Sequence, residues 1–254
     1  MNSTIVQREE LTKFIASELD ITRFRDYCPN GLQVEGKNQI GLIISGVTAS
    51  IALLEAAIAS GADAVIVHHG YFWRGEDARV VGQLKRRLHL LLEHDLNLFA
   101  YHLPLDSHAV IGNNAQLGKL LGFQASSRFG DQEIGWLGDI QSSVKTVGEL
   151  ARLIETKLGR APMLVGDAQQ PVRKVAWCTG AAQTLFADGI AVGADVYISG
   201  EISEQTVHLS RESGIPYLAC GHHATERYGV QALGEHVAQH FGIRHQFIDI
   251  PNPV

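Results

Sequence analysis

The stretch Gly61–Gly70, GADAVIVHHG, constrains the fold of this chain more than any other segment. Residues 64–67 form an apolar run between glycines, which is typical of a short strand buried on both faces of a parallel sheet. The run ends in two adjacent histidines, at the kind of strand end where open α/β sheets gather their ligands. Successive side chains on an extended chain point to opposite sides, so His68 and His69 are expected to serve two different ions. The sequence therefore predicts a two-metal centre, with a pair of loop histidines as the alternative.

Strands and helices are expected to alternate on both sides of this stretch. Strands are predicted at 40–45, 63–67, 96–101, 134–140, 163–165, 172–178, 215–219 and 244–250, and helices at 49–60, 81–94, 146–158 and 222–240. Such alternation is typical of parallel βαβ units, so we expect an α/β protein. The predicted architecture is two similar α/β domains with mostly parallel or mixed sheets, at 1–124 and 125–254. Terminal elements that cross over would complete the first sheet.

A short internal repeat supports the two similar domains. The GAD motif at Gly61 opens one predicted strand, and it occurs again at Gly193 before a second apolar run. In the second copy, residues 199–201 occupy the place that residues 67–69 hold in the first. The second domain therefore keeps the strand end but lacks its imidazoles, and only one copy is expected to carry this part of the site.

Charge and cysteine usage exclude several classes of protein. A formal net charge of −6 without a Lys/Arg-rich run argues against stable nucleic-acid or anionic-membrane binding, because such affinity comes mainly from phosphate contacts. Three cysteines without a CxxC spacing indicate neither a disulfide framework nor a thiolate zinc site, and they fit a reducing cytoplasm. Residues 1–20 have the pattern of an amphipathic helix rather than a signal peptide, and no segment is apolar enough to span a membrane.

Imidazole and carboxylate side chains follow three of the predicted strands. They are His68 and His69, then His102 and Asp106, and finally His222 and Glu226. If a helix starts at His222, then His222 and Glu226 are i and i+4 and share one face. A mixed set of imidazoles and carboxylates suits zinc, iron or manganese, and Glu226 is placed to bridge two ions. The sequence favours a dinuclear site over scattered structural histidines.

Other residues near these clusters have simpler interpretations. Cys220 ends an apolar strand, which is more typical of a buried thiol than of a metal ligand. The aromatic loop Tyr71–Arg74 is equally compatible with stacking on a purine base and with packing or a subunit contact. The remaining histidines have no convergent partners in the predicted elements and are interpreted as structural; among them are His89, His94, His208, His236, His240 and His245.

Taken together, the motifs resemble one family, the hexameric dinuclear-metal-centre proteins described as homologues of the type 2 form of GTP cyclohydrolase I, also called Nif-three-like. The resemblance spans nearly the whole chain. It is carried by DYCPNGLQVEG at 26–36, GADAVIVHHGYFW at 61–73, HLPLDSHAVIGNN at 102–114, SGEISEQT at 199–206, GHHATER at 221–227 and FIDIPNP at 247–253. It implies a set of metal ligands, with Glu226 bridging, that consists of His68, His69, Asp106, His222 and Glu226.

The resemblance also implies an assembly and an activity. It implies two divalent ions per subunit, a site at strand carboxyl ends between the two domains, and a toroidal homohexamer built as a trimer of dimers. The expected activity is a metal-dependent hydrolase that acts on purine nucleotides such as GTP through metal-activated water, with His102 or His223 moving protons. Another nucleotide amidohydrolase or a phosphoesterase would use the same centre. The alternative is a metal-binding scaffold or regulatory partner protein without turnover.

Overall fold

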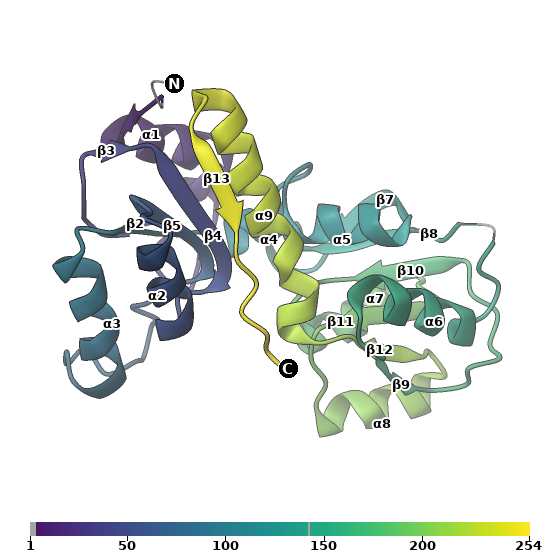
Figure 1. Cartoon of the computed structure of the whole chain (residues 1–254). Helices are drawn as coiled ribbons and strands as arrows, with labels where there is room; N and C mark the ends of the chain where they lie inside the picture. The colour runs from purple at the N-terminus through teal and green to yellow at the C-terminus, as the bar shows by residue number, and fades with distance from the viewer. Residues whose placement is uncertain (1–3, 142) are drawn as a thin grey trace. The chain divides into compact units, whose positions relative to one another are not determined.

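The computed structural model of the protein describes residues 4–141 and 143–254. The chain forms two compact units, which we call unit 1 (Met1–Gly112 and Gly229–Pro251) and unit 2 (Asn113–Tyr228 and Asn252–Val254). Each unit contains one mixed sheet with helices packed on it, so the predicted α/β class is confirmed (Figure 1). Residues 1–3 of the predicted first helix lie outside the described part of the chain.

The main sheet of unit 1 has five strands in the order β13-β4-β5-β6-β2. The first four run parallel, and β2 pairs antiparallel with β6 at the edge. These strands are β2 (Gly31–Val34), β4 (Leu42–Thr48), β5 (Ala64–His69), β6 (Asn97–Ala100) and β13 (Arg244–Phe247), and a separate ladder joins β1 (Val6–Gln7) to β3 (Gln39–Ile40). The helices are α1 (Arg8–Glu18), α2 (Ile51–Ala59), α3 (Gly82–Glu93), α4 (Leu103–Ser107) and most of α9 (His222–Phe241).

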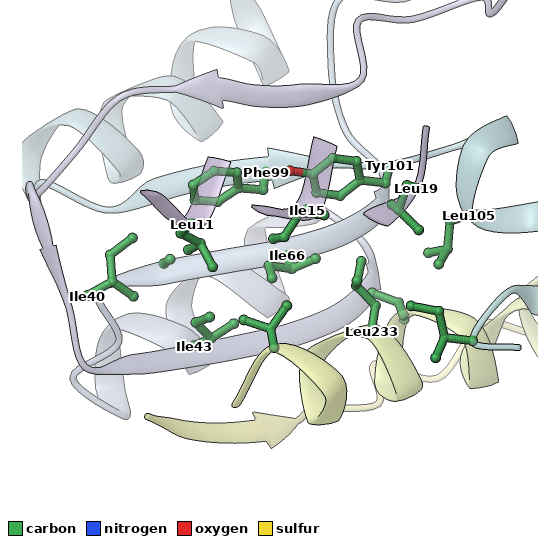
Figure 2. Packing of buried hydrophobic residues seen from close by; sticks show 14 of the residues in the cluster. Leu11, Ile15, Leu19, Ile40, Ile43, Ile66, Phe99, Tyr101, Leu105 and Leu233 are labelled. Carbon is green, nitrogen blue, oxygen red and sulfur yellow. The ribbon is translucent and has the colours of Figure 1, made fainter. Parts of the chain in front are cut away.

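Apolar side chains on the two faces of this sheet pack into two separate cores. Ile43 and Ile66 point to the core that α1 and α9 cover (Figure 2). Their neighbours Ile44 and Val65 point to the opposite core, which α2 and α3 cover. Residues 64–67 are therefore buried on both faces, as expected for a central strand of a parallel sheet.

The sheet of unit 2 has six strands in the order β7-β8-β10-β11-β12-β9. Only β10, β11 and β12 are parallel to one another, so the sheet is mixed. Its strands are β7 (Gln124–Phe129), β8 (Gly135–Asp139), β9 (Met163–Val165), β10 (Lys174–Trp177), β11 (Val196–Ser199) and β12 (Tyr217–Ala219). The edge strand β7 was not predicted, because its first four residues are exposed and polar or small.

The division between the units falls before α5 (Asn113–Leu121), whereas the predicted boundary follows residue 124. The reason is packing: Leu117 and Leu121 of α5 are buried in the core of unit 2 beside Trp177. Three further helices pack on this sheet, namely α6 (Val147–Leu158), α7 (Phe186–Ala191) and α8 (Glu204–Ser213). The segment Gly229–Pro251 belongs to unit 1, where β13 pairs with β4, so elements from the end of the chain complete the first sheet.

The repeated GAD motif makes the same hydrogen bonds in both units. In unit 1, Asp63 Oδ2 accepts the backbone N–H groups of Gly41 and Leu42 at 2.9 and 3.1 Å. In unit 2, Asp195 Oδ2 accepts two backbone N–H groups at the start of β10, at 3.0 and 2.8 Å. Each aspartate thereby joins its own strand to the start of the neighbouring parallel strand. The GAD motif therefore fixes the strands relative to each other, and the candidate metal ligands follow at the strand ends.

Helix α9 begins at His222, the residue predicted from the sequence. It starts in unit 2 and ends in unit 1, where Val230, Leu233 and Val237 are fully buried. Within residues 4–141 and 143–254, no helix is both long and apolar enough to cross a membrane.

Replacing Asn97 with Ala is expected to lower the free energy of unfolding by about 3 kcal/mol, because it leaves buried backbone groups without partners. The Asn97 side chain accepts the N–H of Gly36 at 2.8 Å and donates to the carbonyls of Lys37 and Asp63 at 2.8 and 3.0 Å. Urea unfolding followed by circular dichroism measures the change. Asn38→Ala, at an exposed position nearby, is the control, and equal stability of the two variants would contradict the prediction.

Candidate metal centre

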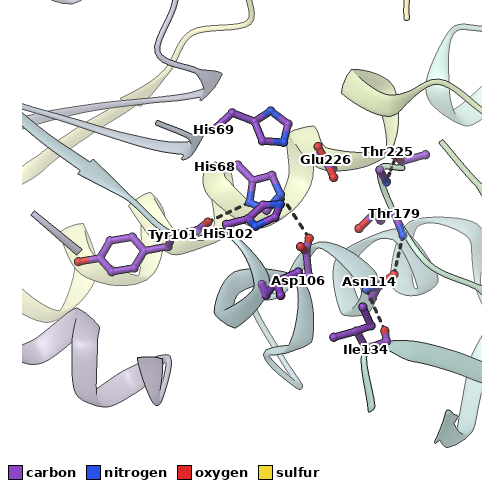
Figure 3. A network of polar contacts seen from close by, with 12 residues as sticks. His68, His69, Tyr101, His102, Asp106, Asn114, Ile134, Thr179, Thr225 and Glu226 are labelled. Atoms are coloured by element: carbon purple, nitrogen blue, oxygen red, sulfur yellow. Dashed lines mark hydrogen bonds and ion pairs between the residues drawn. The ribbon is translucent and has the colours of Figure 1, made fainter. Parts of the chain in front are cut away.

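Strand β5 delivers His68 and His69 to its carboxyl end. His68 is fully buried, and its Nδ1 lies 2.9 Å from the Tyr101 carbonyl oxygen (Figure 3). His69 Nδ1 lies 3.1 Å from Thr48 Oγ1, on the neighbouring strand β4. The two ring centroids are only 4.6 Å apart, which is closer than strict alternation along a strand predicts. The chain leaves the strand at His69, and side chains in strands lean along the strand direction.

A third imidazole joins this pair from the end of β6. One ligand nitrogen each from His68, His69 and His102 lies within 4.8 Å of the others. His102 precedes α4, and Asp106 follows one turn later, with its carboxylate 3.4 Å from His68 Nε2. Asp106 is 6% exposed, so its charge faces the cluster in a largely water-excluded position. Unit 1 by itself therefore brings together three imidazoles and a carboxylate.

His102 is held by an aspartate that the sequence analysis did not single out. Asp26 Oδ1 lies 2.7 Å from His102 Nδ1, and Oδ2 accepts the N–H of Leu103 at 2.9 Å. Burial by itself would raise the pKa of Asp26, but hydrogen bonds from His102, Asn30 and Tyr27 outweigh burial and lower the pKa to about 2. Asp26 is therefore a stable carboxylate. Its position at the start of the DYCPNG motif was the available signal.

In unit 2, the first turn of α9 presents the predicted pair His222 and Glu226. His222 Nε2 lies 3.0 Å from Glu226 Oε2, as the i, i+4 spacing requires. The other ring nitrogen, Nδ1, lies 2.7 Å from Glu201 Oε1. Burial by itself would lower the pKa of His222, but the carboxylates of Glu226 and Glu201 outweigh burial and raise the pKa to about 9.

Glu201 was missed by the sequence analysis, although the repeat locates it. It stands where His69 stands in the first GAD copy, so the second unit places a carboxylate at the corresponding strand end. In unit 1 the residue at this place is an imidazole of the cluster, whereas in unit 2 it supports an imidazole that α9 supplies. The repeat was interpreted as having lost this part of the site, but it retains a supporting group.

The four histidines of these clusters share one arrangement. In each, Nδ1 lies within 3.1 Å of an oxygen, so the ring orientation is set and Nε2 is the nitrogen directed to the cluster. Metal-bound histidines almost always have such an oxygen partner on the second nitrogen, because it fixes the tautomer and strengthens the ligand. The residues present therefore fit zinc, iron or manganese, which accept imidazole and carboxylate ligands.

Two glycines, Gly180 and Gly200, allow the strand ends of unit 2 to lie against His222 and Glu226. Gly180 has a φ of +68°, and a Cβ there would meet the Glu226 carboxylate and lie 3.2 Å from His222 Nε2. Gly180 also accepts backbone hydrogen bonds from Gly200 and Glu201 at 2.8 and 3.2 Å. The turn at Gly180 thus lies against the Glu226 carboxylate and also accepts the backbone N–H of Glu201, the residue whose carboxylate contacts His222.

Replacing Gly180 with Ala is expected to weaken metal binding by about tenfold or more, because the added methyl displaces Glu226 and His222 and the positive φ disfavours alanine. Isothermal titration of zinc into the chelator-treated protein measures the change. Gly193→Ala is the control, because Gly193 also has a positive φ, of 82°, but nothing lies within 4 Å of its added Cβ. Unchanged zinc affinity in Gly180→Ala would mean that the backbone here does not position the ligands.

Two further residues near the site are His223, which was predicted to move protons, and Cys220, which was predicted to be a buried thiol. The backbone N–H of His223 donates to the Val254 carbonyl at 3.0 Å, and its proton-transfer role remains a prediction. Cys220 is fully buried, and burial raises the pKa of its thiol, which disfavours a thiolate ligand there.

The aromatic loop after β5 has mainly structural contacts. Tyr71 is buried and donates to the Ala49 carbonyl at 2.7 Å, so its ring is not available for stacking on a base. Trp73 packs edge-on against His102, with ring centroids 4.9 Å apart. Arg74 donates to the Asp26 carbonyl at 3.0 Å. The loop thereby supports the His102 side of the cluster.

Fold and site first define a class: an α/β protein whose strand ends carry histidine and carboxylate clusters that can hold metal. The chain belongs to the Duf34/NIF3 (NGG1p interacting factor 3) family, whose model matches residues 6–253. It is 54% identical over 238 residues to a Pseudomonas aeruginosa protein named GTP cyclohydrolase 1 type 2 homolog, covering 92% of this chain and 94% of that protein. The family predicted from the sequence motifs is thus confirmed.

Solved structures give the same result for the fold. One described as protein ybgI, of unknown function, is 45% identical with a TM-score of 0.93, covering 98% of this chain and 100% of that one. A crystal structure of a protein from Thermus thermophilus is 32% identical with a TM-score of 0.88, with the same coverage. The fold described above is therefore shared along the length of these relatives.

Proposed function

We propose that this protein is a metal-dependent hydrolase with a dinuclear centre that acts on purine nucleotides such as GTP. The observation that carries the proposal is the cluster of three imidazoles beside Asp106. Each ring is oriented by a hydrogen bond between its Nδ1 and an oxygen atom of another residue. The name of the Pseudomonas aeruginosa relative supports the substrate class. We propose two divalent ions, zinc, iron or manganese, held by His68, His69, Asp106, His222 and Glu226.

Divalent ions bound at this centre would lower the pKa of a water molecule and polarise the bond that it attacks. The residues of the chain supply the rest. Asp26 accepts the Nδ1 proton of His102, which leaves Nε2 as the proton acceptor on the cluster side. The largely buried carboxylate of Asp106 supplies negative charge beside His68. Trp73 packs against the ring of His102 in a T-shaped contact, and the His102 side chain is 16% exposed.

Turnover by metal-loaded protein on a panel of purine nucleosides and nucleotides tests the proposal. We expect hydrolysis of a nucleotide that stops with a chelator and returns when zinc, iron or manganese is added back. Metal-loaded protein with no product from any member of the panel would favour the alternative, a metal-binding scaffold or regulatory partner protein.

We also propose, from the family resemblance, that the chain assembles as a toroidal homohexamer, a trimer of dimers, in the cytoplasm. A ring with inward-facing sites would admit small nucleotides and exclude folded macromolecules. Light scattering that shows a stable monomer at micromolar concentration would remove the hexamer from this proposal.

A further inference from the structure

A cavity of about 290 Å³ lies in unit 1, beside the loop that follows β5. Its walls come from that loop, from the segment after it and from the first turns of α3, and the polar side chains among them belong to Trp73, Glu76, Asp77, Arg79, Gln83 and Arg87. Pockets for whole drug-sized ligands are about 300–1,000 Å³. This cavity therefore fits a part of a small molecule, such as one or two phosphate groups.

Arg87 gives the cavity a positive charge that the protein does not neutralise. Its guanidinium carbon lies 5.4 Å from the centroid of the Tyr71 ring, which is itself held by the hydrogen bond to Ala49. Its Nε is buried without a hydrogen-bond partner, and within the described residues no carboxylate pairs with Arg87. Arg87 lines the cavity and is only partly buried, so the accessible part of its side chain can reach an anionic acceptor there. Phosphate matches the planar donor geometry of a guanidinium.

The other charged side chains around the cavity are less suited than Arg87 to bind an anion. Arg79 is paired with Asp77, with its Nε 3.0 and 2.9 Å from the two carboxylate oxygens, so these two charges largely cancel. Glu76 is exposed, where water weakens the effect of its charge on the cavity without removing it. Residues 74–87 contain five basic and two acidic residues in a chain whose net charge is −6, so the local charge is opposite to that of the whole protein.

Trp73 connects the cavity to the imidazole cluster. It lines the cavity and packs edge-on against His102 at 4.9 Å between ring centroids. Its Nε1 donates to the Gly70 carbonyl at 3.2 Å, and Gly70 directly follows His69. Trp73 therefore separates a ligand group in the cavity from His102, and its ring centroid also lies 6.1 Å from that of the proposed metal ligand His69.

We propose that this cavity binds the phosphate of a phosphorylated small molecule, with Arg87 as the principal contact. That the molecule is the substrate of the metal centre rests on the hydrolase proposed above. Phosphate binding itself does not depend on that activity, since every residue of the cavity lies outside the candidate metal ligands.

Isothermal titration of the 254-residue chain with guanosine 5′-monophosphate, guanosine and inorganic phosphate tests the proposal. We expect the monophosphate to bind at least about tenfold more tightly than guanosine, and Arg87→Gln to lose at least about tenfold in monophosphate affinity, which corresponds to one charge-assisted hydrogen bond. Arg86→Gln, at the exposed neighbouring position on α3, is the matched control and should bind as the wild type does. Equal affinities of Arg87→Gln and Arg86→Gln would overturn the proposal.

Two further variants test the proposal even if the Arg87→Gln protein does not fold. Arg87→Lys retains the charge without the planar fork and should keep part of the affinity. Glu76→Gln, at an exposed position, removes a carboxylate from the rim and should bind the monophosphate about twofold more tightly, and unchanged or weaker binding there would contradict the proposed polarity. Inorganic phosphate that binds as tightly as the monophosphate would identify free phosphate as the ligand and exclude a nucleotide.

The same titrations in the presence of EDTA distinguish failure of this inference from failure of the proposed hydrolase. Binding that depends on Arg87 and survives EDTA supports the phosphate site whether or not nucleotides are turned over. Binding that disappears with EDTA assigns the phosphate to bound metal and overturns the role of the cavity.

Discussion

Protein carrying Glu226→Gln is expected to bind neither of the two proposed ions, with metal content falling from the proposed two per chain to none. Glu226 is 3% exposed and lies 3.0 Å from His222 Nε2, so its carboxylate contributes negative charge directly beside that imidazole within unit 2. A bridging carboxylate contributes charge to both ions, and glutamine offers only one neutral acceptor of similar shape. Metal analysis after reconstitution with zinc, iron or manganese measures the content.

The control is Glu235→Gln, which changes an exposed glutamate on the same helix whose carboxylate accepts a hydrogen bond from Gln231 at 2.9 Å. This variant should bind two ions. If Glu226→Gln loses one ion and keeps the other, Glu226 is a terminal ligand and the bridging assignment is wrong. Full metal content in the variant would remove Glu226 from the ligand set.

Protein carrying His102→Ala is expected to keep its metal while its turnover falls by about 10²–10⁴, the range typical for loss of a general acid or base. His102 is oriented by Asp26 at 2.7 Å, and the ligands implied by the family resemblance do not include it. Single-turnover kinetics and metal content, measured on the same preparation, test the two parts of this prediction. His94→Ala, at an exposed position after α3, serves as the control.

The structure also gives a reason why His102→Ala could lose metal. Because His102 shares a cluster with His68 and His69, it has the position of a third imidazole ligand. A metal-depleted His102→Ala protein would therefore move His102 into the ligand set. An active variant with full metal content would instead remove it from proton transfer.

The positions of the candidate metal ligands on strands and helices were predictable because they depend on local sequence pattern. The apolar run at 64–67 predicted β5, and its end predicted where His68 and His69 emerge. The i, i+4 spacing of His222 and Glu226 predicted a shared helix face, because that geometry needs only a helix that begins at His222. Strand ends and helical turns are set by neighbours in sequence, so sequence by itself determined these features.

The supporting contacts were decided only by tertiary structure. Asp26 and His102 are 76 residues apart, and Glu201 and His222 are 21 apart, so no local pattern relates either pair. The Asp26 contact arises because the chain before β2 lies beside the end of β6, and the Glu201 contact because the end of β11 lies beside the start of α9. The sequence determined which side chains are available at each strand end. Packing of the sheets decided which carboxylate orients which imidazole, because that depends on how distant segments pair.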